Sequence, residues 1–260
     1  MQVGIVDYLL RLKEEACFYM AQGLGFRCID LAVDVVGDPQ RILFDLDRPN
    51  ELRELSTSTD MAVSGIYATH FLRENLVHLD THHRQPAVVA LKTLVERAKS
   101  HAIPTVIVPL FGASEVVGDK EHGVLQEVLE NLLATTALDG VTVALKTTMP
   151  TSRLVALIDR YQSEHLGICH DPGNGGPLGR DPREELRELG HRVAHVHLKD
   201  RLHSGESVAL GEGDVNLEAV INGLIEIKYD GPIVLETPAS ASPIEAAKRN
   251  LAAFRDRLAA

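Results

Sequence analysis

The sequence predicts an α/β fold, a single (β/α)8 TIM barrel that forms one domain over residues 1–260. A chain of 260 residues has the usual length of this barrel. A short apolar strand, a polar loop and a helix of 3.6-residue period follow one another eight times along the chain. Because strands joined by helices run parallel with right-handed crossovers, we expect the eight units to close into a barrel.

The eight expected strands are short apolar runs bounded by polar or glycine-containing segments. We place them at residues 3–6, 27–31, 62–68, 105–108, 141–145, 166–170, 193–198 and 233–235. The helices between them combine an apolar face with a polar face. They are expected at residues 8–22, 50–57, 85–100, 121–137, 152–162, 183–188, 217–227 and 243–258.

Four of the expected strands end in one polar residue each. These residues are Lys146, Asp171, His197 and Glu236. The pattern is clearest in RVAHVHLKD (192–200), which alternates apolar and polar residues and then stops in a charged turn. Catalytic groups of this barrel lie at the C-terminal ends of its strands, so the sequence predicts a site where the four side chains converge.

The alternation of side chains along a strand also assigns residues to the two faces of the barrel wall. If the four polar strand ends point inward, Cys169 and His195 lie one layer below them and should not touch a ligand. His170 then points outward. The other outward positions are uniformly apolar, as residues that face helices should be, and they are Val141, Val143, Leu145, Ile168, Val196, Leu198, Ile233 and Leu235.

The composition limits the partners of the chain. A net charge of −11 repels polyanions, so we expect no nucleic-acid partner. No apolar run is long enough to span a membrane, and the N-terminus does not resemble a signal peptide. Three widely spaced cysteines, Cys17, Cys28 and Cys169, are typical of reduced core thiols, which indicates a cytoplasmic protein.

Five ordered segments resemble one known superfamily. They are GFRCIDL (25–31), LGICHDPGNG (166–175), HVHLKD (195–200), GEGDVN (211–216) and YDGPIVLET (229–237). Together they are similar to the xylose isomerase-like TIM barrel superfamily, which contains sugar phosphate isomerases and epimerases and the endonuclease IV type (AP endonuclease family 2). The resemblance extends over essentially the whole chain.

The resemblance implies a set of site residues. In epimerases of this superfamily a divalent metal is held by a Glu ending strand five, an Asp ending strand six, a His in strand seven and a Glu ending strand eight. The last three positions correspond to Asp171, His197 and Glu236. The chain departs from the pattern at Lys146, which replaces the first Glu, and at Asn174, where a His is common. No cofactor is therefore required, and a divalent metal (Mn²⁺, Mg²⁺ or Zn²⁺) on the three matching residues stays open.

Further residues are candidates for binding substrate. His70 ends the third expected strand, where superfamily members often have a His near the substrate, and a packing role is the alternative. Glu115, Asn174 and Arg201 lie in loops after strands and could contact a polar substrate, with a solvated loop as the alternative for the charged ones. Asp30 stands at the second-strand Glu position of the superfamily, and we expect it to bond within the barrel.

Lys146 suggests how the site could work without a metal. Two carboxylates carry −2, and a protonated Lys146 brings the total to −1, as a divalent ion does with three carboxylates. A +1 and a +2 charge roughly 4 Å apart repel by about 8 kcal/mol at an effective dielectric near 20. We therefore expect a metal-free or weakly metal-binding site, with Lys146 paired to Asp171 or Glu236. In the alternative, Lys146 extends into solvent and leaves a three-ligand metal site.

The sequence thus predicts an isomerase or epimerase that transfers a proton next to the carbonyl of a sugar or polyol, with Glu236, Lys146 and His197 as catalytic residues. One alternative is a dehydratase or other lyase on a keto-sugar or inosose, which could use a Schiff base on Lys146. Another is a barrel without catalysis that binds a partner. DNA repair is disfavoured, because Pro109, Asn174 and Asn216 stand where the endonuclease type has metal-binding histidines. The expected partner is a small carbohydrate-like molecule, and a homo-oligomer is compatible with the sequence.

Overall fold

The computed structural model describes residues 2–258 and confirms the predicted fold class. Its parallel strands hydrogen-bond in the order of a closed barrel, β1-β10-β7-β6-β5-β4-β3-β2, with helices between them in the chain. The barrel strands are β1 (Gln2–Val6), β2 (Cys28–Ala32), β3 (Ala62–Tyr67), β4 (Thr105–Leu110), β5 (Thr142–Thr147), β6 (Leu166–His170), β7 (Val193–Leu198) and β10 (Pro232–Leu235). A separate antiparallel hairpin consists of β8 (Asp200–Arg201) and β9 (Ser207–Val208).

Most of the helices match the segments expected from the 3.6-residue period. The α-helices are α1 (Glu14–Leu24), α2 (Glu51–Thr59), α3 (Thr81–Ser100), α4 (Asp119–Thr135), α5 (Thr151–Tyr161), α6 (Pro172–Gly175), α7 (Pro182–Leu189), α8 (Leu217–Glu226) and α9 (Pro243–Leu258). The 3-10 helices are η1 (Asp7–Leu10), η2 (Ile42–Phe44), η3 (Thr69–Leu72), η4 (Gly112–Ser114), η5 (Gly176–Leu178) and η6 (Gly190–Arg192). Within residues 2–258, every helix is too short or too polar to cross a membrane.

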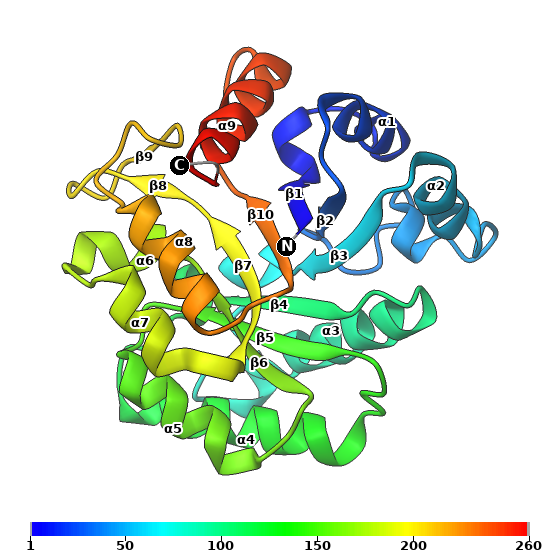
Figure 1. The fold of residues 1–260 in the computed structure, drawn as a ribbon. Coiled ribbons are helices and arrows are strands. Elements are labelled where there is room, and N and C mark those ends of the chain that lie inside the picture. The colour runs from blue at the N-terminus through cyan, green and yellow to red at the C-terminus, as the bar shows by residue number, and fades with distance from the viewer. Residues whose placement is uncertain (1, 259–260) are drawn as a thin grey trace. The chain divides into compact units, whose positions relative to one another are not determined.

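The contacts divide the chain into two compact units. The first contains residues up to 31, residues 54–64 and the chain from 169 onward, and the second contains residues 32–53 and 65–168. In the first unit β1 pairs with β2 and β10, and β10 pairs with β7. In the second unit β4 pairs with β3 and β5, and β5 pairs with residues 166–168 of β6. The colour bar of Figure 1 allows the reader to follow these segments along the ribbon.

In the first unit, α7 and α8 pack against each other and precede the two strands β7 and β10 (Figure 1). Helix α7 begins at Asp181, whose carboxylate accepts the backbone N–H groups of Arg183 and Glu184, as a good N-cap does. The two helices approach closely at Gly223 of α8, where a Cβ atom would lie 2.8 Å from Leu186 Cδ1 of α7. A glycine at this position lets Leu186 lie against the backbone of α8, so the two helices pack closely.

One expected helix is interrupted, and another, expected at residues 85–100, begins earlier, at Thr81. Residues 8–22 were expected to form a single helix that ends at Gly23, whereas the structure has η1, a break, and then α1. The break occurs because Arg11 adopts a left-handed conformation with φ of 52°, which a continuous right-handed helix does not accommodate. Helix α1 ends at Gly25, whose φ of 98° is the usual conformation of a glycine after a helix.

The hairpin after β7 was not expected from the sequence. It is held by Asp200, whose side chain is fully buried and accepts the backbone N–H groups of Gly211, Gly213 and Val215. A Cβ atom at Gly213 would lie 2.1 Å from Asp200 Oδ1, so this glycine lets the loop backbone reach the carboxylate. The chain directly after the strand end Lys199 is therefore firmly fixed.

Candidate functional site

Three polar residues at strand ends meet in the first unit, and one of them, a lysine, contacts the other two. Asp171 follows β6, Lys199 follows β7 and Glu236 follows β10. The ammonium Nζ of Lys199 lies 2.5 Å from Glu236 Oε1 and 3.8 Å from Asp171 Oδ2. Asp171 and Glu236 are buried, and the Lys199 side chain is only 12% exposed. A cation of the chain itself therefore lies beside both carboxylates.

His197 links this group to the interior of the barrel. Its Nδ1 lies 3.0 Å from Glu236 Oε2, and its Nε2 lies 2.8 Å from Asp30 Oδ2. Both ring nitrogens thus face a carboxylate oxygen, and the ring is fully buried. These two contacts fix the orientation of the imidazole and of the Glu236 carboxylate beside it.

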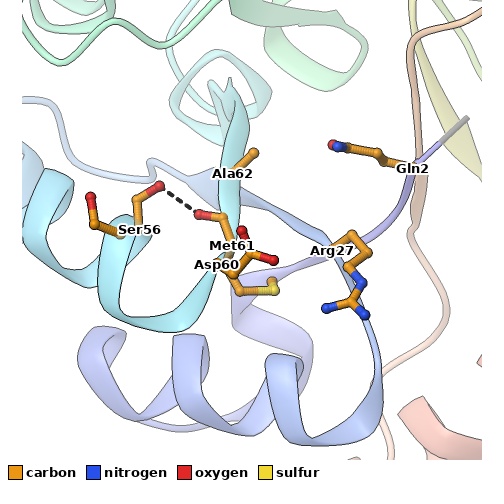
Figure 2. A pocket seen from close by; sticks show the side chains of 7 residues that line it. Gln2, Arg27, Ser56, Asp60, Met61 and Ala62 are labelled. Atoms are coloured by element: carbon orange, nitrogen blue, oxygen red, sulfur yellow. Dashed lines mark hydrogen bonds between the residues drawn. The ribbon is translucent and has the colours of Figure 1, made fainter.

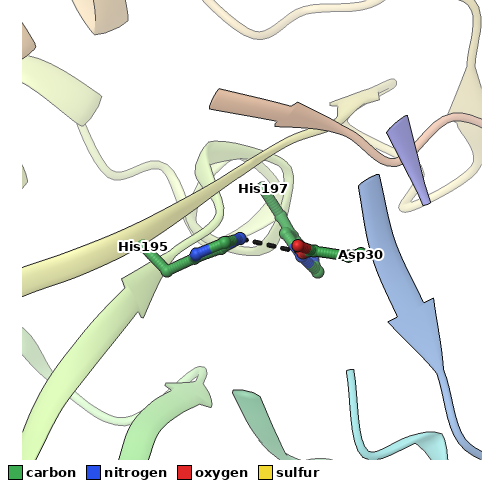
Figure 3. A group of neighbouring side chains, drawn as sticks. All are labelled: Asp30, His195 and His197. Carbon is green, nitrogen blue, oxygen red and sulfur yellow. Dashed lines mark hydrogen bonds and ion pairs between the residues drawn. The ribbon is translucent and has the colours of Figure 1, made fainter. Parts of the chain in front are cut away.

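Asp30, on β2, is the centre of a buried polar cluster. Its Oδ2 lies 2.8 Å from Nε2 of His195 as well as from His197, and its Oδ1 accepts the hydroxyl of Ser64 at 2.6 Å. Figure 3 shows the three side chains Asp30, His195 and His197 pointing toward one another from β2 and β7. Because β1 and β10 separate β2 from β7 in the strand order, these contacts cross the interior of the barrel.

The cluster also determines the charge state of Asp30. Burial by itself would raise the pKa of this carboxyl, because a charged group loses its hydration. The charge of His195 and the hydrogen bonds from both histidines outweigh burial and hold the pKa of Asp30 well below its usual range. Asp30 is therefore a carboxylate inside the barrel, as the sequence analysis expected from its position on the second strand.

Two sets of residues are candidates for holding a metal ion, and one of them fits. Asp30, His195 and His197 each offer one ligand atom, and the three atoms lie within 4.8 Å of one another. A carboxylate and imidazoles are ligands suited to Mn²⁺ or Zn²⁺, so this set fits a divalent ion chemically. The set implied by the resemblance, Asp171, His197 and Glu236, does not fit while the Lys199 ammonium lies between its carboxylates, because an ammonium repels a dication.

Lys146, the strand-five residue, lies in the second unit. It is only 1% exposed, so the alternative in which it extends into solvent is wrong. Its ammonium lies 3.4 Å from the hydroxyl oxygen of Tyr67 and 4.8 Å from the centre of that ring. A pairing of Lys146 with Asp171 or Glu236 stays a prediction, whereas Lys199 makes these contacts within the first unit.

The other predicted substrate residues differ in burial. In the second unit, His70 is half-buried, with Nδ1 3.2 Å from the carbonyl oxygen of Asp34, and Glu115 is exposed. In the first unit, Asn174 is buried on α6 and Arg201 is half-buried on β8. Asn174 Nδ2 and Arg201 Nε are buried and have no hydrogen-bond partner among residues 2–258. Two such donors can receive oxygen atoms of a ligand.

The expected faces of β6 and β7 agree with the contacts in the first unit. His195 is fully buried and reaches the interior through Asp30, one layer below His197. Cys169 is also buried, and it forms no disulfide bond within residues 2–258. The side chain of His170 points to the opposite face of the strand, where its Nε2 lies 3.5 Å from Oε2 of Glu185 on α7. Whether His195 and Cys169 stay clear of a ligand is a prediction that the structure leaves to experiment.

Sequence reasoning missed the position of Lys199 beside the carboxylates and treated this residue as part of a charged turn. The signal was present in HVHLK, because His195, His197 and Lys199 are two residues apart and share one face of an extended strand. The same parity that assigned His197 to the interior would have placed Lys199 beside it.

A pocket of about 330 Å³ lies at the other ends of the strands in the first unit. It is lined by residues at or next to the amino ends of β1, β2 and β3, among them Gln2, Arg27 and Ala62 (Figure 2). In parallel barrels the catalytic groups lie at the carboxyl ends of the strands, and the amino ends serve stability. This pocket is therefore not the candidate active site.

The strand order defines a class of protein, the parallel (β/α)8 barrels, and the buried polar strand ends lie at the carboxyl ends of the strands, where active sites of this class are found. The sequence profile described as xylose isomerase-like TIM barrel matches residues 18–257. The chain therefore belongs to the xylose isomerase-like TIM barrel family.

Known relatives are distant in sequence. An uncharacterised protein of Methanocaldococcus jannaschii is 32% identical over 47% of this chain and 40% of its own length. An inosose dehydratase of Clostridium perfringens is 26% identical over 59% of this chain and 61% of its own length. The chain thus spans less than two thirds of these relatives. The 3-keto-D-glucoside 4-epimerase YcjR of E. coli has a similar structure, with a TM-score of 0.80 and 15% identity over 98% of this chain and 99% of that one, which shows a common fold.

Proposed function

We propose that the chain is an enzyme that transfers a proton at the carbon next to the carbonyl of a keto-sugar or polyol ketone, as isomerases and epimerases do. The observation that carries the proposal is the buried Glu236 carboxylate, held at both oxygens by His197 and Lys199 at the carboxyl end of β10. A carboxylate with a fixed orientation in a largely water-free position is suited to act as a general base.

In the proposed reaction, Glu236 accepts the proton of the substrate C–H bond. The electron pair of that bond moves into the C–C bond, and the carbonyl oxygen takes up the negative charge. His197 acts by orientation, since its contacts to Asp30 and Glu236 hold the base at one angle. Protonation of the opposite face of the same carbon gives an epimer. Protonation of the former carbonyl carbon, with transfer of the hydroxyl proton to the other oxygen, gives an isomer.

The residues that would bind substrate carry buried N–H groups that can still donate a hydrogen bond. Asn174 and Arg201 each bury a nitrogen without a partner in the described part of the chain, and hydroxyl oxygens of a polyol are suitable acceptors. His70 and Glu115 of the second unit are retained as further substrate contacts. The proposed substrate is therefore a small, hydroxyl-rich, carbohydrate-like molecule.

A second candidate function is dehydration. It is favoured by the curated relatives named inosose dehydratase, among them the protein of Clostridium perfringens. The first step is the same proton transfer to Glu236, after which the C–O bond of the neighbouring carbon breaks and the hydroxyl group takes the proton from Glu236 and leaves as water. The two candidates therefore share a base and differ in the fate of the intermediate.

The test is to incubate the protein with a panel of keto-sugars and inososes in D₂O and to follow the products by proton NMR. We expect deuterium at the carbon next to the carbonyl of one compound. Glu236→Gln should lower the rate by about 10²- to 10⁴-fold, the usual contribution of a general base. The matched control is Glu245→Gln, which makes the same change at an exposed residue of α9.

The products separate the two candidates. Exchange with an epimer or isomer supports the first function, and loss of water supports the second. Exchange that proceeds unchanged in Glu236→Gln contradicts both.

A further inference from the structure

Lys199 is held in place by its surroundings. Its stem packs on Gly173 of α6, where a Cβ atom would lie 2.9 Å from Lys199 Cγ and 3.0 Å from its Cβ. A side chain at residue 173 would thus displace the lysine. On the other side, the next residue, Asp200, is fixed by three backbone N–H groups of the loop after the hairpin. A fixed strand end and a close contact with Gly173 therefore hold the ammonium in its position.

Part of the negative charge of the site is neutralised without an added ion. Asp171 and Glu236 carry two negative charges, and the Lys199 ammonium neutralises one of them at 2.5 and 3.8 Å. A divalent ion bound by the same two carboxylates would lie within a few ångströms of the ammonium, and the repulsion in a buried site is strong. The sequence analysis predicted such an ammonium at Lys146, and within the first unit the contact is made by Lys199.

We propose that Lys199 takes the place of the divalent ion that the family resemblance implies at Asp171, His197 and Glu236, and that it is a catalytic residue. This second part rests on the proposed function. When the C–H bond breaks and its proton moves to Glu236, the carbonyl oxygen of the substrate becomes an oxyanion. The Lys199 ammonium donates a hydrogen bond to this oxygen, keeps its own proton, and stabilises the charge as it develops.

The first experiment measures metal binding and does not depend on any substrate. The chelator-treated protein, Lys199→Met and the control Lys248→Met, which changes an exposed lysine of α9, are titrated with Mn²⁺ by calorimetry. Methionine keeps the length of the side chain and removes its charge. We expect Lys199→Met to bind Mn²⁺ at least about 10-fold more tightly than the native chain and the control, because the repulsive charge is gone. Circular dichroism spectra and thermal melts check that all three proteins are folded.

Two outcomes overturn the inference. One is tight, stoichiometric Mn²⁺ binding by the native chain that Asp171→Asn abolishes, which assigns the ion to the carboxylates beside Lys199. The other is equal affinity in the native chain and Lys199→Met. Neither outcome depends on whether the proposed reaction is correct.

The second experiment uses the deuterium-exchange assay. With a compound that exchanges, Lys199→Met should lower kcat by about 100-fold or more with a smaller change in KM, as removal of one oxyanion donor does. Lys199→Arg, which keeps the charge, should recover part of the loss, and a chelator should leave the native rate unchanged. A rate that falls with chelator and returns with Mn²⁺ overturns the catalytic role. If no compound exchanges, the proposed function fails while the metal titration still decides the place of Lys199.

Discussion

Asp30 is a buried group whose removal should cost the protein several kcal/mol. It is 0% exposed and accepts from three side chains, namely His195, His197 and Ser64. Asp30→Ala leaves two imidazoles and one hydroxyl buried without their acceptor. Each buried group that loses its partner costs about 1–3 kcal/mol, and removing one member of a buried ionic group costs about 3–5 kcal/mol. We therefore expect Asp30→Ala to lower the free energy of unfolding by about 3–5 kcal/mol.

Two milder variants show how the loss of stability divides among the contacts of Asp30. Asp30→Asn keeps one acceptor oxygen and the shape of the side chain, so we expect about half of the loss, roughly 2 kcal/mol. Ser64→Ala removes only the hydroxyl donor to Asp30 Oδ1 and should cost about 1 kcal/mol. The residues share one cluster, so the double variant should cost less than the sum of the single variants.

Urea unfolding followed by circular dichroism measures these free energies, with a check that the slope of the transition is unchanged. Because the folded pKa of Asp30 is lowered from 3.8, its stabilising effect is present above that value and is lost as the pH falls below it. The difference between the native protein and Asp30→Asn should accordingly shrink below about pH 4. A loss under about 1 kcal/mol for Asp30→Ala would refute the view that the cluster is a satisfied network.

Three further predictions concern other parts of the first unit. Arg183 and Arg187 lower the pKa of the exposed Glu226 from 4.5 to about 2, so their stabilising effect is present above pH 4.5 and declines as the pH falls toward 2. The melting temperature of Glu226→Gln should therefore fall less over that pH range than the melting temperature of the native protein. An equal fall in both proteins would count against this ion pair. Burial raises the pKa of the Cys28 thiol to about 12, so a polar disulfide reagent at pH 8 should react with it far more slowly in the folded than in the unfolded protein, and similar rates would contradict its burial. Asp200→Ala releases three backbone N–H groups, so hydrogen exchange should accelerate at residues 211–215, and unchanged exchange would show that the loop is held by other contacts.

The barrel could be predicted because its signals are local. Alternation in RVAHVHLKD and the helical period of residues 243–258 depend only on neighbouring residues, and both elements were found with little or no change in bounds. The break at Arg11 was missed because one left-handed residue does not interrupt the apolar pattern on either side. Short elements such as α6 lie in a glycine-rich segment whose composition favours turns over helices.

The part of the site that was predicted also depends on a local signal, the alternation of side chains along each strand. Parity assigned Asp171, His197 and Glu236 to the interior, and the structure brings His197 and Glu236 into contact. Which cation reaches the carboxylates depends on distances between strand ends, and these are set by barrel geometry that no local pattern records. Lys199 and Lys146 both follow the parity rule, so only the three-dimensional arrangement identifies Lys199 as the lysine 2.5 Å from Glu236.

The anchoring of the hairpin by Asp200 separates the tip of the hairpin from the strand that carries Lys199. The tip, residues 202–206, is closed by its own backbone hydrogen bonds, between Leu202 and Glu206 and between Gly205 and Leu202. His203 and Ser204 at its end are exposed. A peptide grafted between these two residues would lengthen a surface turn beyond the anchor and leave β7 in register. This turn therefore offers a place to attach an affinity tag or a fluorescent label while the strand end at Lys199 stays fixed.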